Sequence, residues 1–405
     1  MSKQISATVM KKLVVGIQGQ ILIINFDGEK FTITGRYEKQ GWNPCSILFK
    51  DPNLLYVINS APGAGDISLF KLGPDFSNSS SRSSQVNSAS GPWTKAFMEK
   101  PTLVSSAKGS SGGVHMEFNA DKTRIVAACS ESSSVDTWDI SAGDGSPKLV
   151  KSSSIPDLPW GLVTRSGRKH SPRQAVLDPT GRFFIVPDLG GDCLIVIDDA
   201  KNAASSNTSY SNVITLPAGA CPRRVAFLTN NGTHYLIVLT ECSNELLLFE
   251  VEYTNDTMDL KLIQREGTWG FMPPGSMSGT EVAELQVAKN QRDVYVSNRL
   301  HGTRGNIIAH FVFTNKVGDV QLSYADGWWR SGFQPRIMCL SADDDQEFAF
   351  VGSEAGGSGL VALKRNPVTG VIDLTPVATM SILELAAPGI PKDSRAKGPE
   401  FIGEI

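Results

Sequence analysis

The chain has 405 residues, of which 40% are hydrophobic and 20% are charged, with 38 glycines and 22 prolines. This composition is typical of a turn-rich globular protein and excludes a disordered chain. The formal net charge of −3 provides no field that would attract nucleic acid or an anionic membrane, so we expect neither as a partner.

The N-terminal segment MSKQISATVMKKLVVGIQGQ places its lysines directly before a short strand-like run. It therefore has the pattern of neither a membrane span nor a signal peptide. We expect a cytoplasmic protein, although four N-x-S/T sequons would permit glycosylation in a secretory pathway. These sequons begin at Asn78, Asn207, Asn231 and Asn255.

The six cysteines are scattered along the chain, with no C-x-x-C pair and no histidine at the spacing of a metal site. The motifs G-x-x-x-x-G-K-[ST] and H-E-x-x-H are also absent from the sequence. We therefore expect neither a cofactor nor a metal.

One pattern recurs six times along the chain: an apolar strand, a polar turn rich in Asp, Asn, Pro or Gly, and a second strand of β-branched and aromatic residues. Each copy is a hairpin signal. The copies begin at Pro44, Gly113, Pro172, Pro222, Val282 and Pro335, and most are followed by a third apolar strand. Three or four short strands per repeat, without an amphipathic helix, are typical of the blades of a β-propeller.

A seventh blade is expected from the two ends of the chain. We assign to it the N-terminal strands within Leu13–Asp27 and the C-terminal strands within 359–366 and 370–380. Such closure removes the edge strands of the ring. The sequence thus predicts an all-β fold with one seven-bladed domain over residues 1–405, carrying a Ser-rich insertion (77–91), an apolar insertion (269–279) and a C-terminal tail (381–405).

The motifs SPRQAVLDPTGRFFIVPDLGGD, CPRRVAF, EVAELQV with VYVSNR, and QPRIMCL resemble the lactonase family of seven-bladed propellers. That family includes 6-phosphogluconolactonase-type bacterial proteins and the fungal 3-carboxy-cis,cis-muconate cyclase. The similarity extends from Leu13 to about Met380, and it implies a divergent fungal member.

In the fungal cyclase, the resemblance implies a site in which a histidine, two arginines and a glutamate bind the muconate carboxylates. Three of these positions match Arg223, Glu241 and Arg299 of this sequence. The position of the histidine is occupied by Arg173. A guanidinium stays protonated, so Arg173 cannot move a proton, but it can polarise a substrate oxygen.

The first strand of each propeller blade runs closest to the axis, so residues at its start are candidates for a shared site. Glu241 and Arg299 would reach this site from the ends of second strands, and Trp42 would stack on a flat substrate at its mouth. The inner candidates are His115, Arg173, Arg223, Glu284 and Arg336.

Several roles stay open for these residues. The arginines either bind an oxygen-rich substrate or form ion pairs that tie the blades together. His115 is either a proton-transfer group or a hydrogen-bonding residue between blades. Glu241 is either a base or the counter-charge of Arg223.

The first functional hypothesis is a small-molecule cyclase that acts on a conjugated, oxygenated natural-product intermediate, for instance in a hetero-Diels–Alder step of fungal secondary metabolism. The replaced histidine favours it, because such catalysis needs orientation and polarisation more than proton transfer. One alternative is a conventional lactonase or carboxymuconate cycloisomerase with His115 or Glu241 as base. Another is a non-catalytic propeller that binds proteins.

Overall fold

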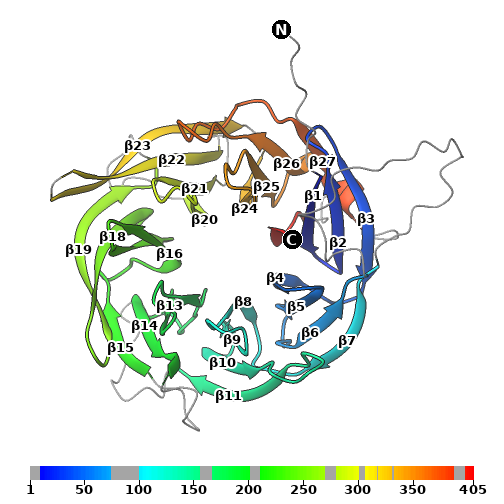
Figure 1. Cartoon of the computed structure of the whole chain (residues 1–405), viewed down its shortest axis with the longest axis horizontal. Coiled ribbons are helices and arrows are strands. Elements are labelled where there is room, and N and C mark those ends of the chain that lie inside the picture. The colour runs from blue at the N-terminus through cyan, green and yellow to red at the C-terminus, as the bar shows by residue number, and fades with distance from the viewer. Residues whose placement is uncertain are drawn as a thin grey trace, which may run out of the picture.

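A computed structural model describes residues 10–73, 100–155, 167–200, 210–269, 280–300, 306–316, 318–330, 333–386 and 397–405. Within these ranges the chain forms seven four-stranded antiparallel sheets, which follow one another around a central axis as the blades of a propeller (Figure 1). No helix among the described residues is long and apolar enough to cross a membrane. The predicted all-β, seven-bladed fold is therefore confirmed.

In every blade the first strand lies nearest the axis and the fourth lies at the rim. Blade 1 contains β28 (Phe401–Glu404), β1 (Lys11–Ile17), β2 (Gln20–Phe26) and β3 (Phe31–Glu38). Blade 2 contains β4 (Pro44–Lys50), β5 (Leu54–Asn59), β6 (Ile67–Lys71) and β7 (Thr102–Ala107). Blade 3 contains β8 (Gly113–Phe118), β9 (Arg124–Cys129), β10 (Ser134–Asp139) and β11 (Lys148–Ser154). Blade 4 contains β12 (Val176–Leu177), β13 (Phe183–Asp188), β14 (Cys193–Asp198) and β15 (Tyr210–Thr215).

The remaining blades follow the same plan. Blade 5 contains β16 (Pro222–Asn230), β17 (Thr233–Thr240), β18 (Glu245–Tyr253) and β19 (Met258–Gly267). Blade 6 contains β20 (Thr280–Val287), β21 (Asp293–Leu300), β22 (Asn306–Lys316) and β23 (Asp319–Arg330). Blade 7 contains β24 (Pro335–Leu340), β25 (Phe348–Ser353), β26 (Ser358–Lys364) and β27 (Ala378–Ser381), and is followed by the short helix α2 (Ile382–Leu385).

The polar turn of each repeat explains why the hairpins form where they do. In blade 4, one oxygen of the Asp178 side chain accepts the N–H groups of Arg182 (2.9 Å) and Phe183 (2.6 Å). Its other oxygen accepts the N–H of Thr180 (3.0 Å), and Gly181 takes the positive φ of 76° that the turn requires. The carboxylate thus satisfies backbone donors that the ladder leaves unpaired.

The hydrophobic cores lie between neighbouring blades. All six residues of β13 and all six of β14 are buried, because both faces of these sheets are covered by other blades. One core cluster joins Phe183 and Leu194 of blade 4 to Val225 and Leu236 of blade 5. Burial of this apolar surface holds the inner strands at a fixed distance from the axis.

The two chain ends share blade 1, as predicted, but through a different C-terminal strand. β28 pairs with β1, with Leu13 opposite Glu404 and Gly16 opposite Phe401. The assignment of 359–366 and 370–380 to this blade is wrong, since β26 and β27 continue blade 7 from β25. The expected tail therefore supplies the innermost strand, which covers the edge that β1 would otherwise expose.

Most residues of the two predicted insertions lie outside the described ranges. Residues 77–91 lie outside the described residues. Of the apolar insertion only Trp269 is described, and it is buried in the core cluster between blades 5 and 6.

Candidate functional site

A repeated irregularity of the inner strands builds the site. In β4, β8, β16 and β24 the pairing register shifts after the first residue, which leaves one extra residue without a partner in the ladder. A bulge of this kind redirects the side chain of the extra residue. The extra residues are Cys45, Val114, Arg223 and Arg336, and all four line one cavity.

This central cavity has a volume of about 90 Å³. Because its walls come from the inner ends of several different blades, it lies on the axis of the propeller. Four guanidinium groups and one carboxylate contribute to those walls. The lining residues are Cys45, Ser60, Val114, Arg173, Arg223, Arg224, Arg336, Ile337 and Glu400.

Arg173 occupies in blade 4 the place that bulged residues occupy elsewhere. It lies between the isolated bridge Pro172–Asp188 and β12, and its N–H donates to the carbonyl of Pro187 (3.0 Å). Its side-chain Nε is buried without a hydrogen-bond partner, and Arg173 forms no ion pair with any residue that the structure describes. Burial lowers the pKa of Arg173, and the nearby Arg223 lowers it further.

An unpaired guanidinium inside a cavity is costly unless an acceptor binds it. The guanidinium of Arg173 has the donors that suit a carboxylate, a phosphate or a polarised carbonyl oxygen.

The two arginines of β16 are partly neutralised. The Nη1 of Arg223 lies 2.5 Å from Oε2 of Glu241, and its Nε donates to the carbonyl of Ala283 (3.1 Å). The Nε of Arg224 lies 3.3 Å from Oε1 of Glu284, and its Nη1 donates to the carbonyl of Arg173 (3.1 Å). Glu241 and Glu284 thus act as counter-charges behind the wall of the cavity, and neither lines it.

Arg299 and Arg336 share one acidic neighbour, Glu354. Arg336 contacts Glu354 at 2.9 Å, and Arg299 pairs with Glu354 and with Glu281, the latter at 3.1 Å. Burial alone would raise the pKa of Glu354, but the two arginines hold it below its ordinary value. Arg299 does not line the cavity, so its contacts favour the ion-pair alternative for this residue.

Glu400 is the residue that the repeat pattern could not locate. It directly precedes β28, and its N–H donates to the carbonyl of Gly16 (2.8 Å). Its side chain is 7% exposed, and Oε2 pairs with Arg336. Burial raises the pKa of Glu400, while Arg336 opposes that shift. Within the described ranges, Glu400 is the one carboxylate on the cavity wall.

His115 lies behind the cavity wall and does not line it. Its Nδ1 accepts the N–H of Ala175 at 3.4 Å, which links blade 3 to blade 4. Burial, with a smaller contribution from Arg224, lowers the pKa of His115 to about 3. The imidazole is therefore neutral near physiological pH, and these contacts favour the inter-blade role over proton transfer.

The assignment of Trp42 to substrate binding is wrong. Its side chain is buried in the core between blades 1 and 2, 1% exposed. There it packs against Tyr37 and Phe70, with ring centroids 5.9 and 5.7 Å away. A large apolar ring at a blade junction is stabilised more by burial than by lying in solvent at a pocket mouth.

Three or more His, Cys, Asp or Glu side chains do not come together as a metal site anywhere in the described part of the chain.

The family model for the seven-bladed β-propeller lactonases matches residues 16–381. The chain belongs to this lactonase family. Among its relatives, a protein of Arthroderma benhamiae named "Probable 6-phosphogluconolactonase" is 26% identical over 290 residues, which cover 69% of this chain and 64% of that protein. The 6-phosphogluconolactonase of Yersinia enterocolitica is 28% identical over 129 residues, which cover 32% of this chain and 36% of that protein. The matches thus span less than two thirds of these relatives.

Solved structures agree with this membership at the level of the fold. The periplasmic gluconolactonase of Pseudomonas aeruginosa superposes with a TM-score of 0.72 at 18% identity and covers 98% of this chain and 99% of its own. A protein from Lactobacillus plantarum gives a TM-score of 0.70 at 16% identity, with coverage of 98% and 99%. The resemblance seen in the sequence motifs is therefore confirmed.

Proposed function

We propose that the protein hydrolyses a small lactone that carries an anionic group. The observation that carries this proposal is Arg173, whose buried Nε has no hydrogen-bond partner among the described residues, in a cavity lined by three further arginines. The names of the relatives, which refer to 6-phosphogluconolactone and gluconolactone, agree with a substrate of this class.

The cavity constrains how such a substrate binds. Its volume of about 90 Å³ is smaller than the ~150 Å³ cavity that accepts a benzene ring. A phosphate or carboxylate fits inside, where Arg173 and Arg223 supply paired N–H donors. The rest of a small sugar-like ring then lies toward the mouth of the cavity.

Glu400 supplies the base that hydrolysis requires. One of its oxygens is held by Arg336, and the other has no hydrogen bond to a described residue. That free oxygen takes a proton from water as the water attacks the lactone carbonyl carbon, while an arginine stabilises the developing oxyanion. The ring C–O bond then breaks, and the proton passes from Glu400 to the leaving alkoxide, which yields a hydroxy acid.

The bases expected for a conventional lactonase are less well suited. His115 is neutral, with a pKa of about 3, and lies behind the wall. Glu241 is bound to Arg223 at 2.5 Å. Neither contacts the cavity, so the proposed mechanism keeps the lactonase activity but moves the base to Glu400.

The cyclase hypothesis has weaker support. The relatives carry lactonase names, and a cavity of about 90 Å³ does not enclose an extended conjugated precursor. The protein-binding hypothesis does not account for the buried Arg173, whose Nε lacks a hydrogen-bond partner in the described part of the chain.

The test is a rate measurement with three substrates: 6-phosphogluconolactone, unphosphorylated gluconolactone and 3-carboxymuconate. After subtraction of spontaneous hydrolysis, we expect kcat/KM for the phosphorylated lactone to exceed that for gluconolactone by about tenfold or more. Arg265→Ala is a matched control, because Arg265 pairs with Glu245 on the outer strands of blade 5. No acceleration with either lactone would refute the proposal, and turnover of 3-carboxymuconate alone would revive the cyclase hypothesis.

A further inference from the structure

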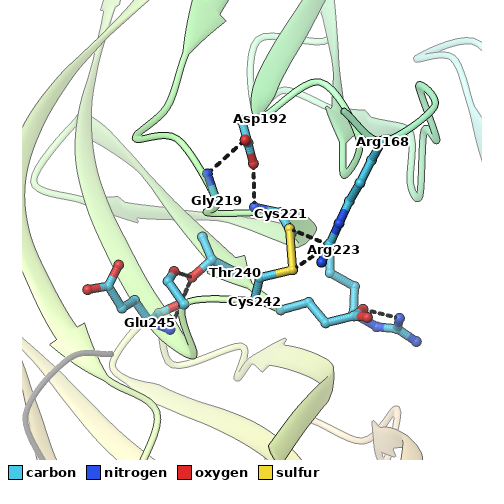
Figure 2. The surroundings of a disulfide bond; sticks show 10 residues. Arg168, Asp192, Gly219, Cys221, Arg223, Thr240, Cys242 and Glu245 are labelled. Carbon is cyan, nitrogen blue, oxygen red and sulfur yellow. Dashed lines mark hydrogen bonds and ion pairs between the residues drawn. A yellow bond between two sulfur atoms is a disulfide. The ribbon is translucent and has the colours of Figure 1, made fainter. Parts of the chain in front are cut away.

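A disulfide joins Cys221 to Cys242 at the inner end of blade 5, with Cα atoms 5.4 Å apart (Figure 2). Cys221 directly precedes Pro222 and Arg223, and Cys242 directly follows Glu241. The bond therefore closes the end of the β16–β17 ladder at the point that carries the ion pair of Arg223 with Glu241.

This end of the ladder is irregular. The register shift in β16 leaves Arg223 without a ladder partner, so the ladder is locally disrupted there. Beyond the last pair, the N–H of Glu241 donates to the carbonyl of Cys221 (2.8 Å). The positions of both side chains thus depend on the backbone at Cys221.

Blades 2 and 3 close the same level with hydrogen bonds. The N–H and the hydroxyl of Ser60 both donate to the carbonyl of Asn43 (2.9 and 3.2 Å) in blade 2, and those of Ser130 donate to the carbonyl of Gly112 (2.7 and 3.1 Å) in blade 3. The remaining four cysteines of the chain are free. Blade 5 therefore carries, in the described part of the chain, a covalent restraint that these blades lack.

The backbone at Cys221 also needs a restraint, because it adopts the left-handed region with φ of 53°. L-residues with a side chain disfavour this conformation. Asp192 holds it by accepting the N–H groups of Gly219 (2.8 Å) and Cys221 (2.7 Å), and Figure 2 shows the disulfide on the opposite side of the same turn. Loss of the disulfide removes the covalent restraint on this turn and leaves its hydrogen bonds.

The surroundings of the sulfur atoms favour reduction from one side. Cys242 is exposed, whereas Cys221 is 1% exposed. The Nη1 of Arg168 lies 2.8 Å from Sγ of Cys221 and 2.6 Å from Sγ of Cys242 (Figure 2). A guanidinium at this place stabilises the thiolate that reduction produces.

We propose that the Cys221–Cys242 disulfide positions Arg223 and Glu241, and that its reduction by a dithiol converts the cavity to a form that binds anions weakly. The effect on turnover rests on the proposed function, but the effect on the backbone and on anion binding does not.

The chemical step is a two-electron thiol–disulfide exchange. A thiolate of the reductant attacks the exposed Sγ of Cys242, the sulfur–sulfur bond breaks, and the electron pair leaves on Cys221 beside Arg168. The second thiolate of the reductant then attacks the mixed disulfide and releases Cys242 as a thiolate. The reductant ends as its own disulfide, and protons from water complete both protein thiols.

The first experiment measures hydrogen exchange of the oxidised and the reduced protein. Thiol titration of the denatured chain should count the four free cysteines before reduction and all six afterwards. On reduction, we expect amides in 220–224 and 240–244 to exchange about tenfold faster, while the middle of β17 stays unchanged. Six thiols before reduction, or equal exchange in both forms, would overturn the proposal.

The second experiment measures the binding of inorganic phosphate by calorimetry. We expect reduction to weaken phosphate binding about tenfold. The variant Cys221→Ser/Cys242→Ser should bind phosphate as weakly as the reduced protein does, and the reductant should not change its affinity. Equal affinity for phosphate in the oxidised and reduced forms would overturn the proposal about the disulfide but not the proposed function. If the oxidised protein binds no phosphate, the proposed function fails, and the exchange result alone decides whether the disulfide positions the turn.

Discussion

Two parts of the ring present the same backbone position to the axis but different side chains. In blades 2 and 3 the extra residue of the inner strand is Cys45 or Val114, whereas in blades 5 and 7 it is Arg223 or Arg336. The bulge itself is common to all four. The repeat therefore supplies a position, and the residue at that position in each blade supplies the chemistry.

The difference makes the central cavity one-sided. Arg173 from blade 4 and Glu400 from blade 1 extend the charged side, and both line the cavity with the arginines. On the neutral side, the thiol of Cys45 donates to the carbonyl of Gly113 (3.1 Å), and burial raises its pKa to about 12. Cys45 thus stays a neutral thiol, and an anionic group is expected to bind against the arginines of the charged side.

The largest effect is expected from Glu400→Gln. Loss of the base should lower kcat by about 100-fold or more with little change in KM. Because burial raises the pKa of Glu400, the activity of the wild-type protein should fall, with decreasing pH, at a pH above the ordinary glutamate value of ~4.5. Steady-state rates across pH measure both effects. Glu400→Asp should recover part of kcat, and unchanged kcat in Glu400→Gln would remove the base from the proposed mechanism.

A smaller effect is expected from Arg173→Ala, on the charged side of the cavity. Its comparison with Val114→Ala tests the difference between the charged and neutral sides. Loss of a charge-assisted contact of about 2 kcal/mol should raise KM for the phosphorylated lactone roughly 30-fold. Val114→Ala removes the side chain at the matching place on the neutral side and should change KM by about threefold at most. Equal effects of the two substitutions would contradict the one-sided description of the cavity.

The smallest effect is expected from His115→Gln, which tests the neutral side through stability. The pKa of His115 is about 3 in the folded protein and ~6.5 in an unfolded chain. Its contribution to stability is therefore fully present above pH ~6.5 and is lost as the pH falls toward the folded value.

The substitution should reduce, by about 2 kcal/mol, the loss of unfolding free energy between about pH 7 and about pH 5. Urea denaturation at both pH values measures it, with His234→Gln in the β16–β17 hairpin as control. An unchanged pH dependence would mean that His115 titrates normally in the folded protein.

The fold followed from local patterns that each repeat contains in full. The alternation of apolar strands with turns such as Asp178–Gly181 depends on side chains a few residues apart, so it is visible without the tertiary structure. The strand that closes the ring, Phe401–Glu404, was not predicted because it has only four residues. Four residues are too few to show the alternation of apolar and polar side chains that marks a strand. Its place is decided by the free edge of β1, which lies at the other end of the chain.

The site was predicted in part. Arg173, Arg223 and Arg336 were expected near the axis and do line the cavity, because their position in the repeat places them at inner strand starts. Trp42 was misjudged, since a loop position does not reveal the core between blades 1 and 2 that buries it. The disulfide was not expected, because Cys221 and Cys242 lie 21 residues apart and meet only through the hairpin register.

By itself, the sequence determined the blades, their order and the arginines at the starts of inner strands, since these follow from short-range patterning of apolar and polar residues. Only the tertiary structure decided which charges are paired and which carboxylate reaches the cavity. Ion pairs such as Arg299 with Glu354, and the approach of Glu400 to Arg336, join residues of different blades or of opposite chain ends. Such contacts depend on how the ring closes. The local sequence pattern does not show which distant residues this closure brings together.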